Sequence, residues 1–203
     1  GKPAGSFGDI SCFSFCQDKI ITTGGEGGLL LTNNRNLWKK AWQYKDHGRD
    51  ISVLLRKKSS GKFIWAVNSL GTNYRMTEMQ AVLGRLALDK LDASVEKRRA
   101  LAQRLNDGLS GLEELRVTIP AQDVYHSYYK YYVFVRPDKF RSGWSRDRFI
   151  RELNASGIPC GTGICPEIYR EKGFVNLRKK RGLASQKRLP VAKELGETSI
   201  MFL

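Results

Sequence analysis

A lysine followed by a glycine-rich run is the feature of this sequence whose residue types could do chemistry. Lys19 precedes Thr23–Gly28, where five of six residues are Gly or Thr. Glycines let backbone N–H groups approach an anion closely. A lysine kept unprotonated by burial or a cationic neighbour can form an imine with a carbonyl cofactor. Ser14, five residues earlier, could donate its hydroxyl to a phosphate.

An ordinary hairpin loop is the alternative interpretation of the same residues. Lysine and several glycines occur together in many tight turns that have no catalytic role. The run is also not a P-loop, because no Gly-Lys-Ser/Thr follows a GxxxxG spacing. Taken alone, the Lys19 loop fits both interpretations, and the hairpin is the more common of the two.

The composition indicates a folded, basic protein. Of the 203 residues, 41% are apolar and 27% charged, and 35 Lys and Arg against 20 Asp and Glu give a formal charge of +15. Such a balance attracts polyanions, whether nucleic acid, membrane surface or phosphorylated small molecules. Much of the excess is dispersed or in short runs such as 178–181, so we expect a solvated basic face rather than a nucleic-acid site.

The four cysteines show neither a zinc pattern nor a disulfide framework. Cys12 and Cys16 have a CxxxC spacing and Cys160 and Cys165 a CxxxxC spacing, so we expect free thiols and no metal site. No stretch approaches the roughly 18 apolar residues of a membrane span, and the N-terminus lacks the apolar core of a signal peptide. A cytoplasmic location follows as the expectation.

Hydrophobic patterning predicts elements around the lysine and beyond it. Residues 10–15 and 28–32 predict strands, the second a continuous apolar run typical of a buried strand. Residues 35–46 predict a helix that ends at Gly48, and 49–70 mostly loop. The remaining predictions are a capping box at Thr77–Gln80, one helix of nearly thirty residues from there to Gly108, a strand at 129–135, helices at 145–155 and 190–196, and a strand beginning at Ile200.

Four separated motifs, in order, resemble the DegT/DnrJ/EryC1/StrS family of aminotransferases. They are Gly5–Ile10 with Cys12–Gly28, then Lys45-Asp-His-Gly48, then Leu70-Gly-Thr-Asn-Tyr-Arg-Met-Thr-Glu-Met-Gln-Ala81 with Gly84, and finally Arg188-Leu-Pro-Val-Ala-Lys-Glu-Leu195. The resemblance covers essentially the whole chain. Motifs that occur together in register are far more specific than the Lys19 loop alone.

The resemblance assigns residues to pyridoxal 5′-phosphate (PLP). It implies that Lys19 carries the cofactor as an imine and then moves the proton between the substrate carbon and the cofactor. It implies that Ser14 hydrogen-bonds the cofactor phosphate. Asn73 would reach the phosphate of the neighbouring subunit, because active sites in this family form at a homodimer interface.

Other residues have less definite roles under the same resemblance. Arg75 is a second candidate at the site, with a structural salt bridge as the alternative. His47 would line the substrate site or cap a helix. Thr22 and Glu26 are expected to shape the loop rather than touch substrate.

Two departures from the family pattern limit these expectations. The aspartate that usually pairs with the pyridine nitrogen, and an earlier glycine/threonine loop, would lie upstream of Gly1; Asp9 does not replace that aspartate. The chain also starts in an expected loop and ends in an apolar run. We therefore expect a catalytically incompetent piece of a longer protein.

The second departure is at Gly161–Tyr169. The family often has a His-Tyr-Pro-like run there that lines the substrate site, whereas this chain has Cys165 near that position.

The expected fold is the α/β aspartate-aminotransferase type, PLP-dependent transferase fold type I. Residues 1–80 would end the large mixed-sheet PLP-binding domain, and 81–203 would form a smaller, incomplete α+β domain. The expected activity is transfer of an amino group, from glutamate, to a nucleotide-linked keto-sugar, in surface-polysaccharide or antibiotic-sugar biosynthesis.

Two alternatives stay open from sequence. Some relatives are sugar dehydratases in which the lysine is replaced, often by histidine, so the presence of Lys19 favours transamination. A non-enzymatic regulator that binds nucleic acid through the basic surface is the other, and it predicts salt-sensitive binding without an imine absorbance.

Overall fold

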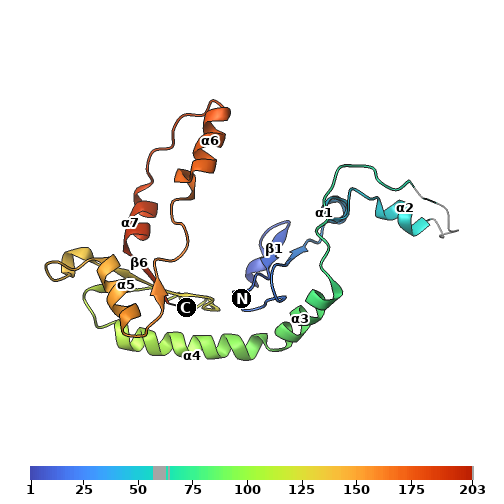
Figure 1. The fold of residues 1–203 in the computed structure, drawn as a ribbon. Coiled ribbons are helices and arrows are strands. Elements are labelled where there is room, and N and C mark those ends of the chain that lie inside the picture. The colour runs from blue at the N-terminus through green and yellow to red at the C-terminus, as the bar shows by residue number, and fades with distance from the viewer. Residues whose placement is uncertain (57–62, 64, 203) are drawn as a thin grey trace. The chain divides into compact units, whose positions relative to one another are not determined.

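A computed structural model describes residues 1–56, 63 and 65–202, and these form two compact units, Gly1–Ser94 and Val95–Leu203 (Figure 1). The expected domain boundary after residue 80 concerns the full-length protein and stays a prediction. Within the described ranges, no helix is both long and apolar enough to cross a bilayer. All four cysteines are free thiols.

A β-hairpin begins the first unit, after a short 3₁₀ turn η1 (Ala4–Ser6). Strands β1 (Ser11–Ser14) and β2 (Gly28–Leu31) pair antiparallel with Ser14 opposite Gly28, which confirms both predicted strands. The expectation that the second strand is buried is wrong for this chain. Its three leucines are 39–49% exposed, because β2 belongs to a sheet of only two strands in the described residues.

Helices α1 (Arg35–Lys45) and α2 (Ile51–Arg56) follow the hairpin. The first confirms the helix predicted at 35–46, and Asn34 caps its N-terminus by accepting hydrogen bonds from two backbone N–H groups. The second corrects the prediction of loop for 49–70. A six-residue helix is too short for a periodic pattern, and its signal is Asp50, which accepts from the Ser52 N–H at 2.8 Å. Residues 57–62 and 64 of that segment lie outside the described residues.

The predicted long helix is two helices, α3 (Glu78–Asp89) and α4 (Leu91–Leu109). Its capping box is confirmed: Thr77 Oγ1 accepts from Gln80 N–H, and Gln80 Oε1 accepts from Thr77 N–H. A single helix is wrong because the chain tightens at Lys90, whose N–H bonds three residues back to the Ala87 carbonyl at 3.3 Å. Apolar periodicity continues through that turn and hides it.

An antiparallel sheet of four strands forms the core of the second unit. Its order is β3 (Leu115–Val117), β4 (Tyr131–Val135), β6 (Ser199–Phe202) and β5 (Cys160–Gly161). Residues of β4 alternate between buried and half-buried, as a strand with one covered face requires. Val133 lies opposite Ile200 in the register, and both are fully buried.

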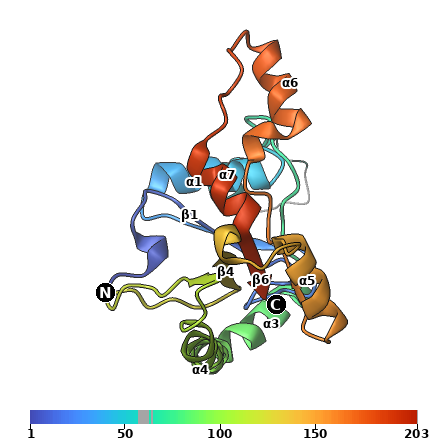
Figure 2. The same ribbon diagram turned by 90° about the vertical axis from the view of Figure 1, so that its left-hand side faces the viewer.

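The helices of the second unit match the sequence in part. The structure confirms the helix and strands predicted at 145–155, 129–135 and the C-terminus as α5 (Arg146–Ala155), β4 and β6, and it extends the predicted 190–196 helix to α7 (Pro190–Thr198). Strands β3 and β5, the turns η2 (Pro137–Lys139) and η3 (Ile168–Arg170), and α6 (Lys172–Lys180) were not predicted. Figures 1 and 2 show α6 at the far end of an excursion that leaves the sheet after β5 and returns through α7.

Candidate functional site

The Lys19 loop is a wide connection closed by backbone hydrogen bonds just beyond the strands. Phe15 N–H donates to the Gly27 carbonyl at 2.8 Å, and Thr23 N–H donates to the Phe15 carbonyl at 3.2 Å. The loop therefore divides into two parts. The outward turn begins after Phe15 and carries Lys19, and the glycine-rich return is Thr23–Gly28. Ser14 is the last residue of β1, directly before the outward turn.

Thr23 is the buried residue of the loop. It is 1% exposed, and its hydroxyl lies 3.4–3.5 Å from the carbonyls of Phe15 and Glu26. A Cβ at Gly27 would lie 2.3 Å from this hydroxyl, so only glycine fits there. Gly24 has φ +77°, a conformation that L side chains rarely adopt. Glycines in the return thus serve a close backbone approach.

Lys19 lies in the turn with its amine partly accessible. Its N–H donates to the Cys16 carbonyl at 3.0 Å, and its Nζ donates to Asp18 Oδ1 at 3.0 Å. The lysine side chain is 32% exposed and the aspartate side chain 46%. Because both side chains are partly exposed, this ion pair by itself contributes little to stability.

Side chains near the turn offer hydrogen-bonding groups as well. Ser14 is an exposed residue, and its Oγ accepts from the Cys16 N–H at 3.4 Å, which leaves its own O–H able to donate. Cys16 Sγ donates to Glu26 Oε1 at 3.4 Å, and Thr22 Oγ1 accepts from the Gly24 N–H at 3.2 Å. Glu26 and Thr22 thus bond to the loop itself, in the positions where sequence analysis expects loop-shaping residues.

A second group of predicted residues gathers where α1 ends. Gly48 N–H donates to the Gln43 carbonyl at 2.7 Å, and the 72–74 segment takes the neighbouring groups: Thr72 N–H donates to the Tyr44 carbonyl at 2.7 Å and its carbonyl accepts from His47 N–H at 3.0 Å. The Lys45–Gly48 and Leu70–Ala81 motifs are therefore joined by backbone hydrogen bonds.

Arg75 connects the side chains of this group. Its Nε donates to Asn73 Oδ1 at 2.9 Å, Nη2 lies 3.3 Å from His47 Nε2, and Nη1 lies 3.3 Å from Asp46 Oδ1. Asp46 is 6% exposed, and its Oδ1 has no hydrogen bond within the described residues, so nearby cations balance its charge. Arg49 supplies a second cation at 3.8 Å.

The structure thus places the five predicted site residues in two groups. Ser14 ends β1 and Lys19 lies in the turn that follows, whereas Arg75 bonds to Asn73 and contacts His47 in the cluster at the end of α1. Arg75 forms the salt bridge that sequence analysis kept as its alternative role. His47 is exposed with φ +58°, in the turn that ends α1.

Two features near these residues were not predicted from the sequence. Gln80 was predicted only as a capping residue, yet its Nε2 donates to the Glu26 carbonyl at 2.8 Å, which ties α3 to the Lys19 loop. Asp46 was part of a quoted motif, but nothing in the sequence marks its carboxylate as buried beside Arg75. Both contacts span many residues of chain, so spacing carries no signal of them.

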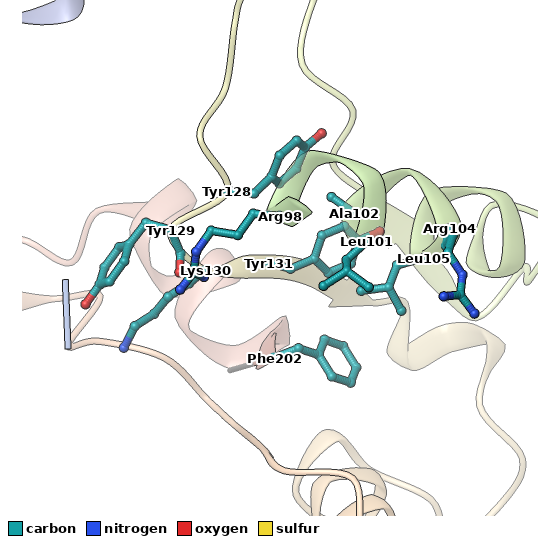
Figure 3. A pocket seen from close by; sticks show the side chains of 10 residues that line it. All are labelled: Arg98, Leu101, Ala102, Arg104, Leu105, Tyr128, Tyr129, Lys130, Tyr131 and Phe202. Atoms are coloured by element: carbon teal, nitrogen blue, oxygen red, sulfur yellow. Dashed lines mark hydrogen bonds between the residues drawn. The ribbon is translucent and has the colours of Figure 1, made fainter. Parts of the chain in front are cut away.

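The second unit holds a further polar cluster and a cavity. Around Cys165, whose Sγ donates to Glu171 Oε1 at 3.4 Å, the chain places the buried carboxylate of Glu167 against Arg188. A cavity of about 460 Å³ lies between α4, residues 128–131 and Phe202 (Figure 3). Its floor includes core residues of the unit, Ala102 and Tyr131, and none of the predicted site residues lines it.

Comparison with known proteins gives the family. A family model for the DegT/DnrJ/EryC1/StrS aminotransferases matches residues 1–201. The X-ray structure of the aminotransferase from Psychrobacter cryohalolentis is 47% identical, with a TM-score of 0.90 over 100% of this chain and 52% of that one.

Curated relatives are more distant. GDP-perosamine synthase of Escherichia coli O157:H7 is 32% identical over 136 residues, which are 67% of this chain and 34% of the synthase. The uncharacterized protein MJ1066 of Methanocaldococcus jannaschii is 31% identical over 164 residues, 81% of this chain and 41% of that protein. The chain spans less than half the length of these curated relatives and about half of the solved one.

These likenesses confirm the expected fold class, PLP-dependent transferase fold type I, for a chain of mixed helices and sheets. The match covers nearly the whole sequence and includes all four motifs that prompted the resemblance. The chain belongs to the DegT/DnrJ/EryC1/StrS aminotransferase family.

Proposed function

We propose that the full-length protein is a PLP-dependent aminotransferase that moves an amino group from glutamate to a nucleotide-linked keto-sugar. The observation that carries the proposal is Lys19: a partly exposed primary amine, in the turn of a hairpin whose glycine-rich return contacts α3, within a chain of this family. GDP-perosamine synthase, a relative, supports a nucleotide-linked sugar as the substrate class.

The residues in the loop fit PLP by the chemistry of their donors. An aldehyde needs a primary amine, and Lys19 presents one with 32% of its side chain exposed. A phosphate needs donors, and the exposed hydroxyl of Ser14 lies at the strand end that leads into the same turn. At Gly24 and Gly27 an added Cβ would lie within 2.8 Å and 2.3 Å of a neighbouring atom, so the return already approaches its surroundings closely.

When bound, PLP supplies an electron-withdrawing ring that stabilises negative charge on the substrate carbon. Lys19 Nζ must first leave the Asp18 carboxylate and lose a proton, because an ammonium has no lone pair for attack. Once the amino group of the substrate had taken its place on the cofactor, the released Lys19 amine would take the proton from the substrate carbon and pass it to the cofactor. Ser14 would orient the phosphate through its O–H.

The cluster at the end of α1 would bind groups other than the PLP held by Lys19 of the same subunit. Asn73 would donate its amide to the phosphate held by the neighbouring subunit of a homodimer, which agrees with the two separate groups of predicted residues. Arg75 is 44% exposed although it pairs with Asp46. Its exposed edge and the exposed His47 ring offer donors for the anionic part of a nucleotide-linked substrate.

A chain that spans about half of its solved relative is proposed to lack turnover by itself. The partner of the pyridine nitrogen and one phosphate-binding loop are expected upstream of Gly1. The dehydratase reaction is less favoured, because Lys19 keeps the amine that transamination requires.

The test is an amino-transfer assay with the full-length protein, PLP, glutamate and a panel of nucleotide-linked 4-keto and 3-keto sugars. Aminated sugar and 2-oxoglutarate should form in equal amounts, and Lys19→Ala should abolish both. Loss of water from the sugar without consumption of glutamate would instead identify a dehydratase. Absence of both products with every sugar, in protein that has taken up PLP, would contradict the proposed substrate class.

A further inference from the structure

Gln80 joins the beginning of α3 to the Lys19 loop through one side chain. Its Oε1 accepts from the N–H and the hydroxyl of Thr77, each at 3.0 Å, and this is the capping end of the amide. Its Nε2 donates to the Glu26 carbonyl at 2.8 Å, between residues 54 positions apart. The two ends of the amide therefore do different things, and capping uses only the oxygen.

The helix face on which Gln80 lies is the face that the loop contacts. Leu83 and Gly84 follow Gln80 by three and four residues and so share its side of α3. A Cβ on Gly24 would lie 2.8 Å from Leu83 Cδ1, and a Cβ on Gly84 would lie 3.0 Å from the Cγ2 of the buried Thr23. The glycine-rich return thus packs on this face of α3. Among the described residues, Gln80 adds a hydrogen bond from its side chain to the return.

A shift of the Glu26 carbonyl would reach the lysine through a short path. Gly27, the next residue, accepts the Phe15 N–H at 2.8 Å. Phe15 also accepts the Thr23 N–H at 3.2 Å, so the return and the outward turn are bonded at two points. The turn that carries Lys19 begins directly after Phe15, and the Lys19 N–H bonds back to Cys16 at 3.0 Å.

We infer that Gln80 is a positioning residue for Lys19, acting through the Glu26 carbonyl and the glycine-rich return. The inference rests on the proposed function, in which Lys19 binds PLP. It assigns to the side-chain N–H₂ of Gln80 a role that a capping residue does not need. A helix N-cap of this kind accepts Glu equally well, so stability of α3 alone does not require an amide.

Because the oxygen and the nitrogen of the Gln80 amide have different partners, two variants of Gln80 can separate helix capping from the bond to Glu26. Gln80→Glu keeps an acceptor for Thr77 and loses the donor to the Glu26 carbonyl. It also places a carboxylate oxygen against that carbonyl. Gln80→Met removes the donor without adding charge. The matched control is Thr77→Ala, which removes the capping hydroxyl and leaves the Gln80 amide free to bond to Glu26.

The experiment uses the full-length protein in two states. In the PLP-free protein, hydrogen exchange is followed for the amides of residues 22–28; with PLP, affinity and the pH midpoint of the imine absorbance are measured. Gln80→Glu and Gln80→Met should speed exchange in the return, because the Glu26 carbonyl keeps only the longer contact with the Thr23 hydroxyl at 3.4 Å. Both variants should weaken PLP binding about tenfold, as expected for one lost hydrogen bond, and move the pH midpoint. Thr77→Ala should lower the melting temperature and leave PLP affinity within about twofold.

The possible results test the positioning role of Gln80 separately from PLP binding by Lys19. If the wild-type protein forms an imine that Lys19→Ala abolishes, but both Gln80 variants keep wild-type affinity, midpoint and exchange, the positioning role is overturned and the proposed function stands. If Thr77→Ala weakens PLP as much as the Gln80 variants do, helix stability explains the effect and the positioning role is overturned. A wild-type protein that forms no imine overturns both.

Discussion

The carboxylate of Glu167 is held by the guanidinium of Arg188, with Oε2 2.7 Å from Nη2 and Oε1 3.0 Å from Nε. The hydroxyl of Tyr169 donates to the same carboxylate at 2.6 Å and accepts the Leu189 N–H at 2.9 Å. These bonds join the two ends of the excursion that carries α6. Glu167 is only 8% exposed whereas the Arg188 side chain is 39% exposed, so the base of this excursion depends on an ion pair with one buried partner.

The first prediction concerns acid stability. Hydrogen bonds from Arg188 and then from Tyr169 lower the pKa of Glu167 from 4.5 to about 2. Because the folded pKa lies below the unfolded one, this contribution is present above about pH 4.5 and is lost as the pH falls towards 2. The melting temperature, measured from pH 6 to pH 2.5, should fall less steeply for Glu167→Gln than for the wild type. Parallel curves for the two proteins would count against this assignment.

The second prediction compares two glycines. Gly48 has φ +74°, and a Cβ there would lie 1.7 Å from the Ser69 carbonyl oxygen. Gly48→Ala should cost at least about 2 kcal/mol of unfolding free energy in urea titrations. Gly108 lies within α4 with no atom close to an added Cβ, so Gly108→Ala should instead stabilise by about 0.5–1 kcal/mol. Equal effects in the two variants would refute the geometric argument.

The third prediction tests the salt bridge of Arg75. Without Arg75, the buried Asp46 carboxylate keeps Arg49, 3.8 Å away, as a neighbouring cation. Arg75→Ala should cost about 1–2 kcal/mol, reduced from the value for a fully buried pair because Arg75 is 44% exposed. In a double-mutant cycle, adding Asp46→Asn should recover part of the loss. Strict additivity in urea unfolding would show that the pair is not coupled.

Local signals in the sequence predicted local structure well. The Thr77–Gln80 capping box, the strands around the Lys19 loop and the helix beginning after Asn34 depend on residues within a few positions of each other. Short elements escaped prediction: α2 and β5 have six and two residues, too few to show a period. The turn at Lys90 escaped because apolar spacing continues across it.

Long-range contacts could not be predicted in the same way. The bond from Gln80 to the Glu26 carbonyl and the pair of Glu167 with Arg188 depend on how the backbone folds back on itself. The expectation that β2 is buried failed for a related reason, since an apolar run shows what could be covered and not whether a further layer is present in the chain.

Chemical reduction can show directly which lysine of the chain holds PLP. The full-length protein is incubated with PLP, reduced with borohydride, digested and analysed by mass spectrometry. We expect a pyridoxyl group on the peptide that contains Lys19, in near-stoichiometric yield, and none at that position when the reductant is omitted. Modification spread over other lysines at similar yield, with Lys19 unmodified, would contradict it.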